Sequence, residues 1–419
     1  MTSFADTRVP ALTGGHFALR RLVSVPVPEF ADRYWGREPL LSPAGTLPRG
    51  FDDLLSNDAV DELVSRRGLR APFLRVAKNG TTVADRAFTE GGGVGAAITD
   101  QVSDEKLLAL FADGATIVLQ GLHRTWEPVI RFSQDLAADL AHPVQVNAYV
   151  TPAQNTGFSD HYDVHDVFVL QVAGEKRWRI RPPVHPSPLR DEPWADRRAA
   201  VEAAAQADPL IEATLRPGDC LYLPRGYLHA ATALGDVSTH LTIGVHPWTR
   251  RHLADELVTA AVRRASSDES VRSSLALGTD LGRPEEWEAD VDVVRDALVR
   301  ALQETSATEL IAPLASRSRR AQRAAPIAPV AQVRAAARLT ERDRVVIRDH
   351  LDARLVPALE GARLLSRAGD LVLSDEDVPA VRRLLEDGQA LVSDLGLGLA
   401  HRLAVAAVVV IADGTGASG

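Results

Sequence analysis

The segment NAYVTPAQNTGFSDHYDVHDVFVLQVAGEKRWRIRP, residues 147–182, decides the fold of this chain. Its β-branched and aromatic residues predict three strands, with Ala173–Glu175 as a tight turn between the last two. Alternate side chains of a strand point to opposite faces. This alternation predicts that His161, Asp163 and His165 share one face, and it makes that face a candidate site.

The last strand of the segment has two contrasting faces. One face would be wet, because it holds three arginines in step, Arg177, Arg179 and Arg181. The other face would be covered, because Lys176 stands there beside Trp178 and Ile180. A buried lysine needs an anion. We therefore expect Lys176 to face a binding pocket.

The strand VQVNAYV, residues 144–150, alternates in an unusual way. One face is entirely Val and Ala, whereas Gln145, Asn147 and Tyr149 make up the other. This pattern fits a strand whose inner face lines a polar pocket and whose outer face is covered by helices. An edge strand with its polar side in water would show the same alternation, so both interpretations stay open here.

A second strand-rich region, residues 215–245, has the sequence LRPGDCLYLPRGYLHAATALGDVSTHLTIGV. Turn signals occur at Pro217–Asp219, at Pro224–Gly226 and at Gly235–Asp236. Short strands at such close spacing are typical of an antiparallel barrel or jelly roll. His229 follows the second turn, where a strand would begin.

Two histidines and one carboxylate on one face of an octahedron suit an iron centre that must also bind a chelating cosubstrate and oxygen. His161 and Asp163 would supply two ligands from one segment, and His229 would supply the third. An HxD pattern alone is common, and each histidine by itself fits a core or surface position equally well. The combination with Lys176, 13 residues after the aspartate, is much more specific.

Several motifs resemble, in order, the Jumonji-C (cupin-4 type) ribosomal oxygenases. The motifs are GATIVLQGLHR, NAYVTP, GFSDHYDVHDVFVLQVAGEKRWRI, GDCLYLPRGYLHAA and STHLTIGV. FADRYWGREPLL resembles the entry motif of the same family, and the likeness covers residues 25–250 best. It implies an α+β protein with a double-stranded β-helix (jelly-roll or cupin, JmjC) core that binds Fe(II), 2-oxoglutarate and O2.

The resemblance also implies roles for single residues. Iron ligands would be His161, Asp163 and His229. Lys176 would pair with the far carboxylate of 2-oxoglutarate, and Thr242 would assist it. Asn147 and Tyr149 would lie near the cosubstrate or the substrate. For His165 we favour a position behind the ligands, and for His240 a structural role.

The reaction implied is oxidative decarboxylation of 2-oxoglutarate to succinate and CO2, coupled to hydroxylation of an unactivated C–H bond. Family members hydroxylate the β-carbon of an arginine or histidine in a ribosomal protein. The net charge of −9 suits such a basic partner. It argues against broad nucleic-acid binding through phosphates, and direct DNA binding is not expected. Two alternatives remain: a related oxygenase acting on a small molecule or biosynthetic peptide, and a metal-binding cupin without oxygenase activity.

The sequence also predicts how the chain is divided. We expect an N-terminal tail (1–22), a JmjC/cupin catalytic domain (23–250), a helical dimerisation domain with a linker (251–333), and a winged-helix-like domain (334–419). The helical part could instead cap the barrel. The Pro/Ala-rich stretch 313–333, which contains RSRR, has the composition of a solvated linker. A homodimer is the expected assembly.

The compartment is expected to be the cytoplasm. The N-terminus has no secretory signal, and the longest apolar run, residues 404–412, is too short to cross a bilayer. The one cysteine, Cys220, lies within an apolar strand and is expected to be a packed thiol.

Overall fold

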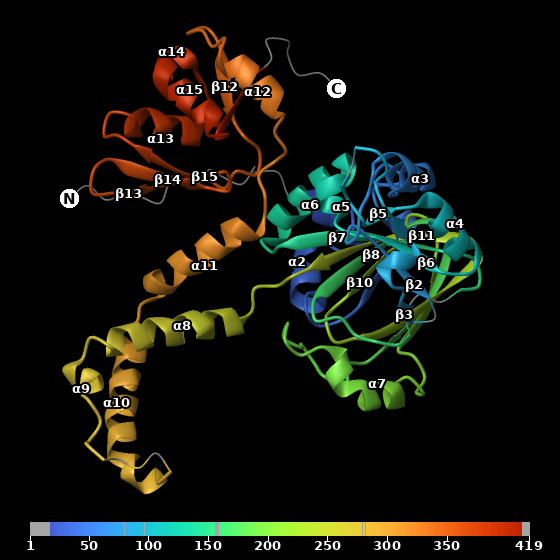
Figure 1. The fold of residues 1–419 in the computed structure, drawn as a ribbon, viewed down its shortest axis with the longest axis horizontal. Coiled ribbons are helices and arrows are strands. Elements are labelled where there is room, and N and C mark those ends of the chain that lie inside the picture. Colours follow the sequence, from blue (N-terminus) through green and yellow to red (C-terminus); the bar gives the residue numbers. More distant parts are fainter. Residues whose placement is uncertain are drawn as a thin grey trace.

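A computed structural model shows a barrel, a helical arm and a C-terminal module (Figure 1). The structure describes residues 17–78, 80–95, 97–155, 159–278, 280 and 282–412. Most of the predicted tail, residues 1–16, lies outside these ranges, as do parts of the glycine-rich loop 91–97 and of the motif GFSD. No helix among the described residues is long and apolar enough to cross a membrane.

A nine-stranded sheet of order β1-β10-β8-β11-β7-β6-β2-β3, with β9 paired to β8, forms the barrel. Two long strands, β8 (Asp166–Arg181) and β11 (Leu228–Val245), run antiparallel along its centre. The other strands are β1 (Leu40–Ser42), β2 (Leu74–Lys78), β3 (Thr81–Thr82), β6 (Thr116–Leu119), β7 (Val144–Thr151), β9 (Ile211–Leu215) and β10 (Cys220–Leu223). A small pair, β4 (Thr89–Glu90) and β5 (Gln101–Val102), lies apart from this sheet.

Helices cover the outer face of β7, as the alternation in VQVNAYV predicted. Val146 and Ala148 of β7 are buried in one core with Val129 and Leu136 of α6. The helices of this region are α1 (Phe17–Arg20), α2 (Val27–Glu29), α3 (Asn57–Arg66), α4 (Asp104–Ala112), α5 (Leu122–Thr125), α6 (Glu127–Leu140) and α7 (Arg198–Ala204). The polar face of β7 is thereby left to the barrel interior.

The predicted turn at Ala173–Glu175 is wrong, and so is the one at Gly235–Asp236. Strands β8 and β11 pass through these positions and pair with each other, with a register shift between Leu234 and Thr239. Gly174 has φ 62°, and a Cβ there would lie 2.1 Å from the carbonyl oxygen of Val237. This position is therefore a β-bulge that only glycine can occupy. Tight turns also favour glycine, which is why the residue was taken for part of a turn. The turns around Gly218 and Gly226 are confirmed.

The face of β8 that was expected to be wet is only partly so. Arg177 and Arg179 are exposed, but Arg181 is buried. The guanidinium of Arg181 donates to a carboxylate oxygen of Asp160 at 2.5 Å and to the carbonyl oxygen of Ala207 at 2.9 Å. A loop therefore covers this end of the strand, and the alternation of side chains along the strand could not indicate that.

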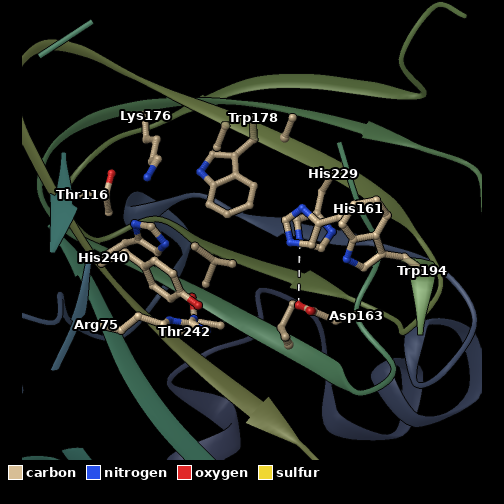
Figure 2. A pocket seen from close by; sticks show the side chains of 15 residues that line it. Arg75, Thr116, His161, Asp163, Lys176, Trp178, Trp194, His229, His240 and Thr242 are labelled. Carbon is tan, nitrogen blue, oxygen red and sulfur yellow. Dashed lines mark ion pairs between the residues drawn. The ribbon is translucent and has the colours of Figure 1, made fainter. Parts of the chain in front are cut away.

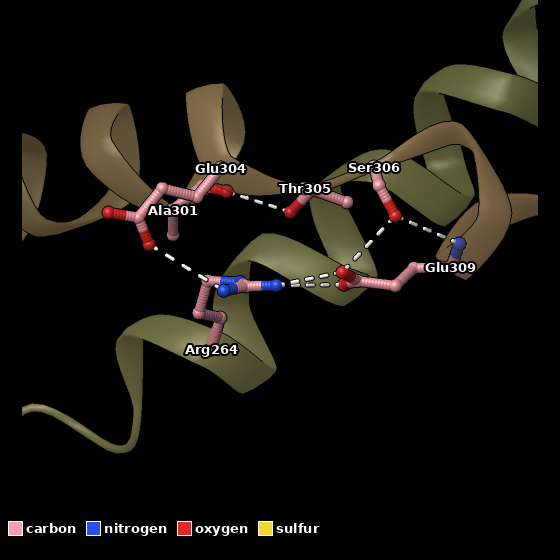
Figure 3. A network of polar contacts seen from close by, with 6 residues as sticks. All are labelled: Arg264, Ala301, Glu304, Thr305, Ser306 and Glu309. Atoms are coloured by element: carbon pink, nitrogen blue, oxygen red, sulfur yellow. Dashed lines mark hydrogen bonds and ion pairs between the residues drawn. The ribbon is translucent and has the colours of Figure 1, made fainter. Parts of the chain in front are cut away.

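Beyond the barrel, the helical arm consists of α8 (Arg250–Ala265), α9 (Glu269–Arg272), α10 (Glu288–Glu304) and α11 (Ala307–Ala321). The buried residues of its small core are four alanines, Ala261, Ala265, Ala297 and Ala301, and the partly buried Val271, Leu298 and Leu302 pack against them. Arg264 of α8 bridges the helices, with Glu304 at 3.6 Å and Glu309 at 2.9 Å (Figure 3). The arm is thus held by close helix contact and ion pairs rather than by a large apolar core.

The predicted linker 313–333 is largely helical, which is a correction. Helix α11 continues through Pro313 to Ala321, and α12 (Pro329–Ala336) follows. Within RSRR, Arg317 pairs with Glu256 of α8 at 2.9 Å, and Arg319 is buried. The prolines and the basic run suggested a solvated linker. Alanine and arginine also have high helix propensity, so the same composition fits a helix. Packing against other elements decides between linker and helix.

The C-terminal module has its own core and two three-stranded sheets, β16-β12-β17 and β13-β14-β15. One of its helices is α13 (Val378–Asp387), and its last strand is β17 (Val409–Ile411). The remaining elements are β12 (Arg344–Ile347), β13 (Arg354–Pro357), β14 (Ala362–Ser366), β15 (Gly369–Leu373), β16 (Gln389–Leu391), α14 (Val392–Leu395) and α15 (Leu397–Val405). The module touches α6 through His350 and Asp135, 3.2 Å apart.

Candidate active site

His161, Asp163 and His229 converge at one end of the barrel pocket (Figure 2). Their potential ligand atoms all lie within 4.8 Å of one another. The segment that holds His161 and Asp163 is not the regular strand that was expected. It is tied to β11 by an isolated bridge, in which the backbones of His161 and His229 exchange hydrogen bonds of 3.3 and 2.8 Å. This bridge brings together two residues far apart in the sequence.

The backbone fixes the orientation of both imidazole rings. Nδ1 of His161 lies 2.7 Å from the carbonyl oxygen of Ser159, and Nδ1 of His229 lies 3.1 Å from that of Tyr227. A carbonyl only accepts, so each Nδ1 carries the proton, and each Nε2 is left as a lone-pair donor. Metal-binding histidines are commonly oriented by this kind of contact. Nε2 of His229 lies 3.8 Å from Oδ2 of Asp163.

Electrostatics keep these donors in the forms that bind metals. Burial lowers the pKa of His229 to about 4, with a further contribution from the neighbouring His161. Burial works to raise the pKa of Asp163, but the imidazoles of His165, His229 and His161 outweigh it and hold this pKa below its ordinary value. At neutral pH the centre therefore offers neutral nitrogen from His229 and a carboxylate. Such a donor set fits a divalent metal of the iron type.

Lys176 lies at the opposite end of the pocket and is only 3% exposed. Its Nζ donates to Oγ1 of Thr151 at 3.1 Å, and Thr116 donates to the same oxygen at 3.2 Å. Among the described residues, Lys176 has no carboxylate partner. Burial lowers its pKa to about 7. A buried amine with only a hydroxyl beside it is prepared for an anion from outside.

The pocket between these two ends has a volume of about 240 Å³. Its walls include stacked rings of Tyr149 and His240, whose centroids are 5.0 Å apart, and the indole of Trp178. Nδ1 of His240 and Nε1 of Trp178 are buried without a hydrogen-bond partner in the described part of the chain. Burial lowers the pKa of His240, and the adjacent Lys176 lowers it further. Unsatisfied polar atoms along a pocket wall indicate a polar ligand.

The remaining residues singled out from sequence have different positions. Thr242 and Tyr149 line the pocket. Asn147 does not: its Oδ1 accepts a hydrogen bond of 3.1 Å from the backbone of Gly121. His165 stacks on His246 at 5.0 Å and lies outside the group that could hold the metal. His240, which we expected to be structural, is part of the pocket wall.

Arg75 and Trp194 are among the pocket residues that were not anticipated. Arg75 belongs to β2 and reaches Tyr149 because both pair with Val118 of β6, which puts them in one row across the sheet. Its guanidinium and the hydroxyl of Tyr149 are hydrogen bonded, while burial raises the pKa of this phenol to about 12. Only strand pairing reveals this row, so no local motif could have shown it.

The fold and the site together define a barrel of the JmjC/cupin class. Residues 124–253 match the family model described as JmjC domain. Among curated proteins, the chain is 29% identical over 222 residues to a bifunctional lysine-specific demethylase and histidyl-hydroxylase NO66 from Aedes aegypti. It is also 31% identical over 231 residues to ribosomal oxygenase 1 from Gallus gallus.

These matches cover 53% and 54% of this chain but only 33% and 36% of the two relatives. The chain therefore spans about a third of their length. Among solved structures, the Escherichia coli ribosomal oxygenase YcfD has a TM-score of 0.54 and 15% identity, over 93% of this chain and 99% of that one. A structure of YcfD with cobalt and 2-oxoglutarate gives a TM-score of 0.53 at 14% identity, over 93% and 99% of the two chains. At this identity the likeness concerns the fold.

Proposed function

We propose that this protein is an Fe(II)- and 2-oxoglutarate-dependent oxygenase that hydroxylates the β-carbon of an arginine or histidine in a ribosomal protein. The observation that supports this best is a single pocket with His161, Asp163 and His229 at one end and, at the other, Lys176, which has no carboxylate partner in the described part of the chain. The names of the relatives agree with it, and the YcfD complex contains 2-oxoglutarate. A net charge of −9 suits a basic substrate protein.

Each group in the pocket has a defined task in this proposal. The two imidazoles and the carboxylate hold Fe(II), which supplies oxygen activation and oxidative decarboxylation of 2-oxoglutarate when it is bound. Lys176 pairs with the far carboxylate of the cosubstrate, and Thr242, which also lines the pocket, assists it. The apolar neighbours Val167 and Val169 keep water from the reacting groups.

Succinate release by the purified chain, supplied with Fe(II), 2-oxoglutarate and O2, tests the enzyme class. Intact-mass comparison of ribosomal proteins from a deletion strain and its parent then tests the substrate, with a difference of one oxygen expected. Succinate release without any modified ribosomal protein would favour a small molecule or biosynthetic peptide as substrate. Metal binding without any succinate would leave a cupin that is not an oxygenase.

The helical arm is proposed to form a homodimer interface. Several apolar side chains on its helices are exposed in the single chain, at 40–56% of their surface: Leu253, Val258, Val262, Val291, Val294 and Ile311. Apolar surface on adjacent helices is a common mark of an interface. Light scattering of the full chain should give a mass of twice the monomer, and Val262→Glu should lower it. An unchanged mass in that variant would place the interface elsewhere.

The domain boundaries, the cellular location and the role of the C-terminal module are also part of this proposal. We propose the boundaries 23–250, 251–333 and 334–419 for the catalytic, helical and winged-helix-like parts, and a cytoplasmic location where ribosomal proteins are available. The last part combines two three-stranded sheets with α13 to α15 around one core. It contacts the barrel and is proposed to serve assembly or protein contact rather than DNA binding.

A further inference from the structure

The carboxylate of Asp163 is positioned differently from the two imidazoles of the metal centre. A backbone carbonyl orients the ring of each histidine, His161 and His229. Within the described ranges the carboxylate of Asp163 has no hydrogen bond, and Nε2 of His229 lies 3.8 Å away, which is too far for one. The orientation of Asp163 must therefore be set by the chain that carries it.

That chain is anchored at Asp163 itself and again three residues later. The carbonyl oxygen of Asp163 accepts a hydrogen bond of 3.0 Å from the backbone of Gly226. The buried carboxylate of Asp166, at the start of β8, accepts one of 2.8 Å from the hydroxyl of Tyr222. His165 lies between these two anchors, so its own packing completes the support of the segment.

The ring of His165 lies directly against the backbone of Gly244 in β11. A Cβ at Gly244 would be 2.6 Å from both Cδ2 and Nε2 of this ring, closer than real side chains approach one another. Gly244 is buried, and by alternation it shares a face of β11 with Thr242, which lines the pocket. The missing side chain at residue 244 therefore provides the space that His165 fills.

A second contact confines the same ring. His246, which follows β11, stacks on His165 with centroids 5.0 Å apart and planes at 22°. The backbone of His246 is itself fixed, because its N–H donates to the carbonyl oxygen of Pro143 at 2.8 Å. A ring that is confined in this way restricts the backbone that carries it, two residues after Asp163.

We propose that His165 is a positioning residue of the metal centre. Its ring, confined by Gly244 and His246, holds the segment 163–165 so that the carboxylate of Asp163 faces the two imidazoles. This inference rests on the proposed function, in which that carboxylate binds a metal ion. His165 is not itself a ligand, because it lies outside the group whose donor atoms come together. It acts by packing, so the shape of its ring matters and its nitrogens do not.

Titration of the full-length, chelator-treated protein with Co(II) tests this, with calorimetry for affinity and visible absorption for the geometry of the bound ion. His165→Ala should lower Co(II) affinity about tenfold and change the absorption, because Asp163 is no longer held. His165→Phe should stay within about threefold of wild type, because a phenyl ring can fill the same space. His401→Ala, at an exposed histidine of α15, is the matched control.

Gly244→Ala provides an independent route to the same state. It keeps His165 but places a methyl group where the ring lies, so it should also lower Co(II) affinity about tenfold. Combining it with His165→Ala should cost no more than His165→Ala alone, because the methyl group then has room. Additive losses in the double variant would show that the two positions act separately, and would overturn the proposal.

The remaining outcomes separate this inference from the proposed function. Wild-type Co(II) affinity and absorption in His165→Ala, even with a lower Tm, would overturn it, because the residue would then be merely structural. A His165→Phe variant as weak as His165→Ala would overturn it as well, because the shape of the ring would not be what matters. Failure of the wild-type protein to bind Co(II) at all would instead refute the proposed function, and this inference with it.

Discussion

The two ends of the barrel pocket solve the problem of buried charge in different ways. At the metal end, Asp163 lies among His161, His165 and His229, so its negative charge has several partners before any ligand arrives. At the other end, the amine of Lys176 contacts only a threonine hydroxyl within the described ranges. Because its pKa is about 7, a large fraction of this amine is deprotonated near neutral pH. The metal end is therefore organised in advance, whereas the lysine end becomes fully charged when an anion enters.

The largest effect is expected at the metal end. Asp163→Ala removes a ligand of the centre, and because loss of groups behind the ligands already costs 10–100-fold, we expect metal affinity and succinate release to fall at least ~100-fold. Calorimetry with Co(II) or Mn(II) and a succinate assay measure the two. Asp296→Ala, an exposed aspartate on α10, is the control. Normal metal affinity in Asp163→Ala would show that Asp163 is not a ligand and that this end of the pocket is not the metal site.

Lys176→Met should act on the other end alone. Losing one charge-assisted hydrogen bond is worth about 1.5–3 kcal/mol, so KM for 2-oxoglutarate should rise ~10–100-fold while metal affinity stays the same. Lys106→Met removes an exposed lysine, whose ammonium donates to the carbonyl oxygen of Thr89, and controls for general charge effects. Equal loss of metal and cosubstrate binding would show that the two ends are not independent.

The pH dependence of stability tests whether Lys176 is buried without an anionic partner. Its pKa in the folded chain, about 7, is below its ordinary value of 10.5. Between these values the unfolded chain binds more protons, so stability should rise with pH by at most about 1.4 kcal/mol per unit. Urea unfolding between pH 7.5 and 9 should show this slope in wild type and a smaller one in Lys176→Met. Parallel slopes in the two proteins would mean that Lys176 is already paired.

The smallest effect is expected for Asn147. Its side chain accepts a hydrogen bond from Gly121 and does not line the pocket, so Asn147→Ala should change KM for 2-oxoglutarate by less than about threefold. The lost hydrogen bond should lower the free energy of unfolding by about 1 kcal/mol. Steady-state kinetics and denaturation measure both. A tenfold rise in KM would restore the role that the sequence motif implied.

Much of the fold could be predicted from local patterns. Alternation in residues 144–150 indicated a covered apolar face and an inner polar face, and the structure has both. The same parity argument indicated that Lys176 points inward, and it is buried. The parity argument failed for Arg181, because a separate loop buries that residue. The turn predictions failed at Gly174 and Gly235, because bulges and turns both use glycine.

Sequence alone determined the kinds of donor and their approximate strands, because periodicity depends on neighbouring residues and survives without knowledge of the partner strands. Only the tertiary structure decided which groups meet. The backbone bridge from His161 to His229 and the row that brings Arg75 to Tyr149 both join segments distant in the chain. Such contacts follow from strand register and helix packing, which no local motif encodes.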